Sequence, residues 1–145
     1  MHKGYIFDMD GTLVDSMGMI MRMDRSMFDR FNVPFSEEAA ETMKYIPLPE
    51  SAAFMKSTFD IPHTVDEVFH IMCDTMRGGY LTVGTKPGVM EYLEFAKNAG
   101  IKLCIATATE TDIALEVAER LGLMGYMDFL VACSEVGASK EKPDV

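Results

Sequence analysis

Residues 5–13 read YIFDMDGTL. The apolar run at their start predicts a buried β-strand over residues 2–8, which delivers two carboxylates to a turn. Residues i and i+2 of an extended chain point to the same side, so Asp8 and Asp10 face one space and Met9 faces away. Gly11 has no Cβ, so the backbone can turn sharply there and approach a ligand closely. Two carboxylates at a strand end suit divalent-cation binding, nucleophilic attack or general acid–base chemistry.

The composition of the 145 residues is that of a globular protein. Hydrophobic residues make up 48% of the chain, enough to form a core. No run approaches the roughly 18 apolar residues of a membrane-spanning helix, and we expect no membrane partner. The net charge of −10 argues against nucleic-acid binding, which needs a basic face. A metal or a local cation can still reverse the field inside a cleft, so a phosphorylated substrate is compatible with this charge.

The cysteines and the N-terminus bear on the cellular compartment. Cys73, Cys104 and Cys133 are an odd number of residues, far apart and in apolar surroundings. We interpret them as buried thiols rather than as disulfides or a zinc site. The N-terminus shows no charged region followed by a long apolar one, as a signal peptide would. These features predict a cytoplasmic protein.

Hydrophobic periodicity divides the chain into two kinds of segment. Residues 15–82 have the pattern of about four consecutive helices without a strand, whereas residues 83–145 alternate between helix and strand. With the first strand, this order predicts an α/β fold with a Rossmann-like parallel sheet, built from residues 1–14 and 83–145. The helical segment is then an insertion directly after the acidic turn. There it can cover the carboxyl ends of the strands, where open α/β sheets bind ligands.

A second candidate site follows the strand expected over residues 101–106. This strand ends in Thr107-Ala108-Thr109, just before an expected helix. A hydroxyl at a strand end beside a helix N-terminus favours phosphate, because backbone N–H groups and the helix dipole attract an anion. The alternative is that these threonines only cap the helix, and the residues alone leave both interpretations open.

The sequence VGASKEKPD, residues 136–144, contains two lysines near the end of the chain. Lysines in such a place are usually solvated. Lys140 and Lys142 are nevertheless the candidates for a cation that would neutralise the carboxylates and a bound phosphate.

These three segments resemble motifs of the haloacid dehalogenase (HAD) superfamily, whose members are mostly phosphohydrolases. The motifs are DMDGTL with Asp15-Ser16 after it, the strand ending in Thr107, and VGASKEKPD. The resemblance implies a HAD-like Rossmannoid core with an inserted helical cap of the C1 class, as in β-phosphoglucomutases and related phosphatases. Lys140 aligns with the motif lysine and Lys142 is the competing candidate. Ser139 stands where the motif usually has glycine.

The resemblance also implies roles for individual residues. Asp8 would be the nucleophile that forms an aspartyl-phosphate, and Asp10 the general acid and base. Thr107 and Lys140 would complete the catalytic set. Mg²⁺ would be the cofactor, held by Asp8 and Asp10. The phosphate would be bound by Met9, Asp10, Gly11, Thr107, Ala108 and Lys140.

The expected function is Mg²⁺-dependent hydrolysis of a small phosphorylated metabolite, of the sugar phosphate or phosphoglycolate type. β-Phosphoglucomutases use a cap histidine where this chain has Ile20 and a cap arginine where Leu48 aligns, so hydrolysis is favoured over phosphoryl transfer between sugars. An inactive HAD-fold fragment or binding protein is a third alternative. Dehalogenases do not need the second carboxylate that Asp10 provides, so its presence argues against dehalogenase activity.

The family's fourth motif, an acidic pair further along the chain, does not precede Val145. We therefore expect the 145 residues to be a fragment of a longer protein. Without the strand that carries this motif, Tyr5–Asp8 would be an exposed apolar sheet edge. Such an edge is a site of possible self-association.

Overall fold

The computed structural model describes residues 4–44 and 46–136. These residues form two compact units. One unit contains the described chain up to Met17 and again from Thr82, and the other is Gly18–Leu81. The sequence predicts divisions after residues 14 and 82, and the units divide after Met17 and Leu81. No helix of the described residues is long and apolar enough to cross a membrane.

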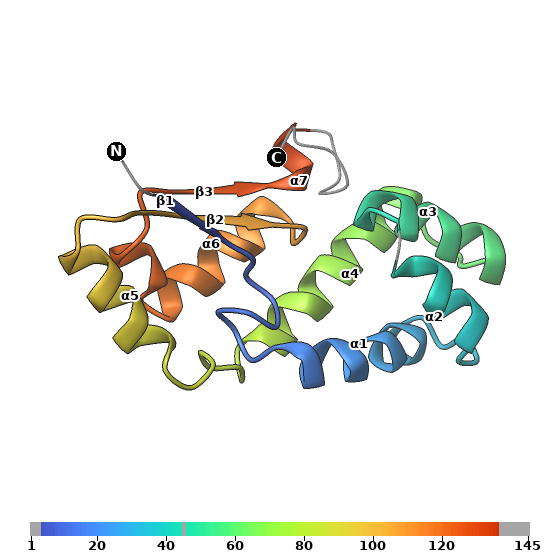
Figure 1. The fold of residues 1–145 in the computed structure, drawn as a ribbon. Helices are drawn as coiled ribbons and strands as arrows, with labels where there is room; N and C mark the ends of the chain where they lie inside the picture. Colours follow the sequence, from blue (N-terminus) through green and yellow to red (C-terminus); the bar gives the residue numbers. More distant parts are fainter. Residues whose placement is uncertain (1–3, 45, 137–145) are drawn as a thin grey trace. The chain divides into compact units, whose positions relative to one another are not determined.

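The first unit is built on a three-stranded parallel sheet in the order β1-β2-β3 (Figure 1). The strands are β1 (Gly4–Phe7), β2 (Lys102–Thr107) and β3 (Phe129–Ala132). In the register of the sheet, Phe7 lies opposite Ile105 and Thr107 lies opposite Ala132. The carboxyl ends of all three strands therefore meet at one edge, as parallel pairing requires. The predicted α/β fold with a parallel sheet is confirmed.

The helices of this unit are α5 (Val89–Asn98), α6 (Thr111–Arg120), the 3₁₀ turn η1 (Leu123–Gly125) and the short α7 (Cys133–Val136). The helices α5 and α6 are the crossovers that connect successive parallel strands. Both are amphipathic, and α6 buries its apolar stripe. The buried residues of α6 are Ile113, Ala114, Val117 and Ala118.

Strand β1 lies at the edge of the described sheet and pairs with β2 alone. Tyr5 and Phe7 contact the ring of Tyr92 on α5, with centroids 6.5 and 6.3 Å away. Ile6 points to the other face, where 72% of its surface is exposed. Self-association through this edge stays a prediction.

The cysteines are only partly as the sequence predicts. None of the three forms a disulfide within the described residues, and Cys73 and Cys104 are buried. The prediction that Cys133 is buried is wrong, because Cys133 begins the short helix α7 after β3 and is half-buried.

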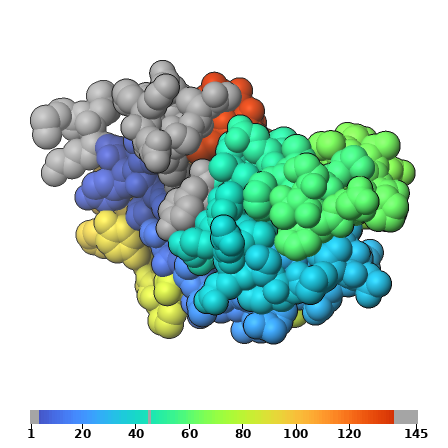
Figure 2. All heavy atoms as spheres, turned by 90° about the vertical axis from the view of Figure 1, so that its right-hand side faces the viewer, coloured from blue at the N-terminus to red at the C-terminus, as the bar shows by residue number. Residues whose placement is uncertain are grey.

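The second unit consists of α1 from Gly18 on, α2 (Glu37–Met43), α3 (Leu48–Phe59) and α4 (Val65–Tyr80). Helix α1 as a whole is Met17–Arg30. In Figure 2 the atoms of α3 and the start of α4, in teal and green, form one continuous surface. The helices α1 to α4 share a core of large apolar side chains, which includes Phe28, Met55, Ile61, Val68 and Met72. This core makes the helical unit a compact body of its own.

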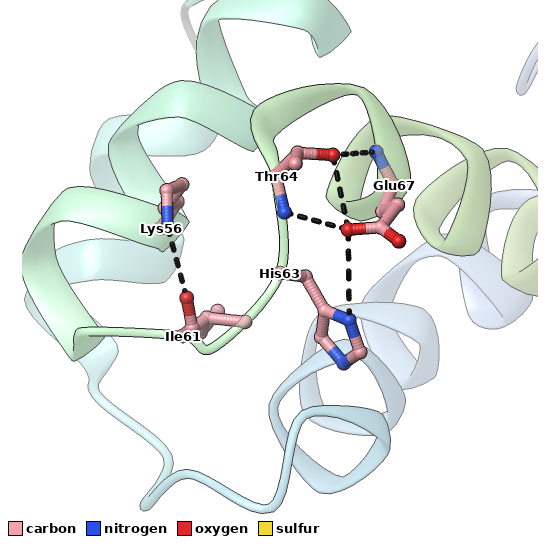
Figure 3. A network of polar contacts seen from close by, with 5 residues as sticks. All are labelled: Lys56, Ile61, His63, Thr64 and Glu67. Carbon is pink, nitrogen blue, oxygen red and sulfur yellow. Dashed lines mark hydrogen bonds and ion pairs between the residues drawn. The ribbon is translucent and has the colours of Figure 1, made fainter.

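The start of α4 carries a capping box, which Thr64 and Glu67 form (Figure 3). The hydroxyl of Thr64 accepts a hydrogen bond from the Glu67 amide at 3.2 Å. The Glu67 carboxylate accepts from the Thr64 amide at 2.7 Å, and the His63 ring lies 3.9 Å from it. The Thr64 amide is the main reason why the pKa of Glu67 is lowered below its usual value. Lys56 also donates to the carbonyl of Ile61, which fixes the turn before the helix.

We expect Thr64→Ala to reduce the free energy of unfolding by about 1 kcal/mol at neutral pH, because an N-cap side chain is lost. Urea denaturation followed by circular dichroism measures this loss. Thr58→Ala, which replaces an exposed threonine on α3, is the matched control. Equal losses in the two variants would show that the cap does not contribute.

The lowered pKa of Glu67 also predicts a pH dependence. Because the folded pKa lies below the ordinary 4.5, the stabilisation is fully present above pH 4.5 and is lost as the pH falls through the folded pKa. Glu67→Gln cannot titrate in this range. We expect wild type to be more stable than Glu67→Gln at neutral pH and to lose that advantage below pH 4.5. If the difference in the free energy of unfolding between the two proteins stayed constant over this range, the role given to the Glu67 carboxylate would be contradicted.

Candidate active site

The candidate site lies where β1 and β2 end. Asp8 is the first residue after β1, and Thr107 is the last residue of β2. Because Phe7 pairs with Ile105, the two strand ends are neighbours at one edge of the sheet. The residues that the sequence places in two separate motifs are thus brought to the same edge.

A tight turn follows Asp8. The carbonyl of Met9 accepts hydrogen bonds from the amides of Thr12, Leu13 and Val14, at 3.3, 2.9 and 2.9 Å. The Met9 side chain is fully buried, whereas Asp8 is exposed. The prediction that Met9 faces away from the carboxylates is confirmed. Gly11 has a φ of 74°, the left-handed conformation that glycine adopts at little cost.

The carboxylate of Asp10 is held by two hydroxyl groups. Ser16 donates to Oδ1 at 2.6 Å and Thr109 donates to Oδ2 at 2.7 Å. Both donors are buried, and Ser16 has no exposed surface. Hydrogen bonds from buried donors to a charged acceptor are short and strong, so they fix the orientation of this carboxylate.

The end of β2 forms a second small network. The amide of Thr109 donates to Oγ1 of Thr107 at 3.1 Å, and Thr107 is fully buried. The N-cap of α6 is Glu110, whose side chain makes no capping hydrogen bond, and the first-turn amide of Ile113 donates to Asp112. The interpretation of these threonines as helix caps is therefore wrong. Ala108, between them, is exposed, which leaves its backbone accessible at the strand end.

The turn is supported by residues 13–15 and residues 84–86, which run antiparallel to each other. The Asp15 amide donates to the Gly84 carbonyl at 2.9 Å, and the Lys86 amide donates to the Leu13 carbonyl at 3.0 Å. The ammonium of Lys86 lies 3.6 Å from Asp15 on the surface, where an ion pair contributes little. The backbone bonds thus fix the segment that ends at Ser16, the donor to Asp10.

The oxygen donors at the turn are of the type that a hard cation such as Mg²⁺ prefers. The carboxylate of Asp8 accepts from the Met9 amide at 2.9 Å through Oδ1. Both carboxylate oxygens of Asp10 accept from hydroxyls, so its backbone carbonyl is the donor better suited to a metal. Within residues 4–44 and 46–136, no group of three or more acidic, histidine or cysteine side chains forms a metal site. Mg²⁺ commonly keeps several water ligands, so the two oxygens fit part of such a site.

Lys140 and Lys142 lie outside the described residues, so the structure does not test the predicted lysine. Sequence reasoning missed the roles of Ser16 and Thr109 as partners of Asp10. Ser16 was already part of the motif, six residues after Asp10, and Thr109 lies at i+2 from Thr107. A hydroxyl residue close in sequence to a predicted site residue is thus the signal that could have identified both partners.

Known proteins resemble this chain over nearly all of its length. The haloacid dehalogenase-like hydrolase family model matches residues 5–145. A phosphorylated carbohydrates phosphatase of Thermotoga maritima is 28% identical over 99% of this chain and 67% of its own length. The validoxylamine A 7'-phosphate phosphatase of Streptomyces hygroscopicus subsp. limoneus is 26% identical over 99% of this chain and 68% of its own.

A solved structure shares the fold of this chain. The β-phosphoglucomutase of Clostridium difficile superposes with a TM-score of 0.76 at 18% identity, over 99% of this chain and 67% of its own. The chain thus spans about two thirds of the length of the relatives it matches.

The turn at Gly11 yields a stability prediction. In Gly11→Ala the φ of 74° would be strained, and the new Cβ would lie 3.0 Å from Sδ of Met17. We expect a loss of about 1–2 kcal/mol in the free energy of unfolding. Gly84→Ala is the control, because its φ is not positive and its Cβ meets no atom within 4 Å in the described structure. The control should stay within about 0.5 kcal/mol of wild type. Similar losses in both variants would refute the strain argument.

Proposed function

This chain belongs to the haloacid dehalogenase-like hydrolase family, and from that membership we propose that it hydrolyses small phosphorylated carbohydrates. One of its relatives is named a phosphorylated carbohydrates phosphatase, and another is named a validoxylamine A 7'-phosphate phosphatase. The observation that carries the proposal is the pair of carboxylates after β1. Asp8 is exposed at the strand end, and Asp10 beside it is held in place by Ser16 and Thr109.

The first step is attack on phosphorus by the carboxylate of Asp8. An O–P bond forms to Asp8 and the O–P bond to the sugar oxygen breaks. Asp10, in its protonated form, gives its proton to the departing oxygen, so the product leaves as an alcohol. The exposure of Asp8 suits it to reach a phosphate that arrives from solvent.

The second step returns the enzyme to its starting state. Asp10 is now a carboxylate and takes a proton from a water molecule, whose oxygen attacks the phosphorus of the aspartyl-phosphate. The bond between phosphorus and Asp8 breaks, which releases inorganic phosphate. Thr107, the backbone amides of Met9, Gly11 and Ala108, and Lys140 are the proposed donors to the phosphoryl oxygens.

Magnesium is the proposed cofactor. When bound, it offsets the repulsion between the attacking carboxylate and the phosphate. The carboxylate of Asp8 and the backbone carbonyl of Asp10 are the residues in this chain that we propose to hold it. A cytoplasmic location is part of the proposal, because cysteines without disulfides suit a reducing compartment.

Mutase chemistry is the alternative, since a β-phosphoglucomutase shares the fold. Leu48, where the mutase arginine aligns, packs against the core of the helical unit. An apolar side chain in this position contributes packing and cannot bind a second phosphate. Hydrolysis is therefore the reaction we propose, with substrate selection by the helical unit.

The nucleophile assignment is tested with Asp8→Asn. We expect phosphate release from sugar phosphates to fall by more than about 10³-fold, because loss of a nucleophile removes the covalent route. The circular dichroism spectrum should stay that of wild type, because Asp8 is exposed. Asp15→Asn is the control. It removes the same negative charge seven positions away and should retain activity. Full turnover by Asp8→Asn would exclude the proposed nucleophile.

The cofactor and the reaction type are tested on the wild-type protein. Phosphate release should stop in EDTA and return when Mg²⁺ is restored. A mutase would instead convert one sugar phosphate into its isomer without releasing phosphate, which anion-exchange chromatography of the products distinguishes. Absence of both reactions across a panel of sugar phosphates would favour the inactive alternative.

A further inference from the structure

We propose that Thr109 is a positioning residue for the acid–base group, and that its hydroxyl fixes the orientation of the Asp10 carboxyl group. The inference rests on the proposed function, since it deepens the role given there to Asp10. Thr109 comes from the connection between β2 and α6, whereas Asp10 belongs to the turn after β1. Their contact therefore joins two distant parts of the chain.

The contacts of Thr109 are made by two different groups of the residue. Its hydroxyl donates to Oδ2 of Asp10 at 2.7 Å, and its amide donates to Oγ1 of Thr107 at 3.1 Å. Only 8% of its surface is exposed, so water competes little for these bonds. One buried residue thus sets the position of the carboxylate and of the hydroxyl proposed to bind phosphate.

The carboxyl group of Asp10 has a hydroxyl partner at each of its two oxygens. The hydroxyl of Ser16 lies 2.6 Å from Oδ1, and that of Thr109 lies 2.7 Å from Oδ2. To act as an acid, Asp10 must carry a proton and donate it. A hydroxyl can rotate and accept a hydrogen bond, whereas an ammonium group has no lone pair to do so. Hydroxyl partners can therefore hold the same carboxyl group before and after it gives up its proton.

The backbone bond to Thr107 has a separate effect. Because Oγ1 of Thr107 accepts from the Thr109 amide, the hydroxyl proton of Thr107 is directed away from that amide. It can then be donated to a phosphoryl oxygen. This bond does not depend on the side chain at position 109. A change of side chain can consequently remove the contact with Asp10 and keep the amide at Thr107.

The experiment compares Thr109→Val, Thr109→Ser and Thr111→Val. Valine has the shape of threonine without the hydroxyl, and serine keeps the hydroxyl. Thr111→Val is the matched control two residues further on, since the Thr111 hydroxyl lies 3.3 Å from that of Ser134. Each protein is assayed with Mg²⁺ on an alkyl sugar phosphate, whose alcohol is a poor leaving group, and on 4-nitrophenyl phosphate, whose phenolate leaves without a proton.

We compare kcat/KM, because it reports the steps up to loss of the alcohol. Thr109→Val should lower kcat/KM for the sugar phosphate by about 10- to 100-fold, a part of what a general acid contributes. It should leave kcat/KM for the aryl phosphate nearly unchanged. Thr109→Ser should restore the sugar phosphate reaction, and Thr111→Val should resemble wild type. Equal losses on both substrates, or no rescue by serine, would overturn the positioning role.

A measurement without turnover separates this inference from the proposed function. If wild type releases no phosphate, the proposed function fails, and the contact is then tested by urea unfolding of Thr109→Val, Asp10→Ala and the double variant. An interacting pair predicts that the denaturation midpoint of the double variant falls by less than the sum of the single shifts. Additive shifts would show that Thr109 does not hold Asp10 and would overturn the inference.

Discussion

The buried carbonyl of Met9 is the acceptor on which the candidate site depends. Three successive amides, those of Thr12, Leu13 and Val14, converge on it and close the turn after β1. Because the Met9 side chain is anchored in the core, the carboxylates on either side of it must face the opposite direction. The turn also brings Ser16 back to Asp10, although the two are six positions apart in the chain. One backbone acceptor thus determines the positions of the proposed nucleophile, the proposed acid–base group and the serine that contacts it.

The fold and the motifs were predictable because they depend on local pattern. The parallel sheet follows from the alternation of strands and helices, and the capping box at Thr64 follows from a glutamate three residues later. The partners of Asp10 do not follow from local pattern. The bond from Thr109 crosses 99 positions, and it exists only because β1 and β2 pair with Phe7 opposite Ile105. A shift of one residue in this register would direct the same hydroxyl elsewhere.

Other differences from the sequence analysis have physical reasons of the same kind. An apolar neighbourhood predicts burial for Cys133, but β3 ends one residue earlier and a helical turn begins there. Burial at the end of a strand depends on what packs on the edge of the sheet, which a single sequence does not specify. The helix cap at Thr109 was equally plausible from sequence. Its hydroxyl could accept from a helix amide or donate to a carboxylate, and tertiary packing selected the carboxylate.

The charge of the chain constrains how a phosphate could be bound here. At −10 overall, the protein repels a dianion at long range, and Asp8 and Asp10 add to the repulsion at the turn. The groups that the described residues offer near these carboxylates are largely amides and hydroxyls. These donors stabilise an anion locally through directed hydrogen bonds but supply no net positive charge. Attraction strong enough to bring the phosphate to Asp8 therefore requires a cation. A divalent metal beside Asp8 meets that requirement in the proposed mechanism, and the acidic chain is then compatible with a phosphorylated substrate.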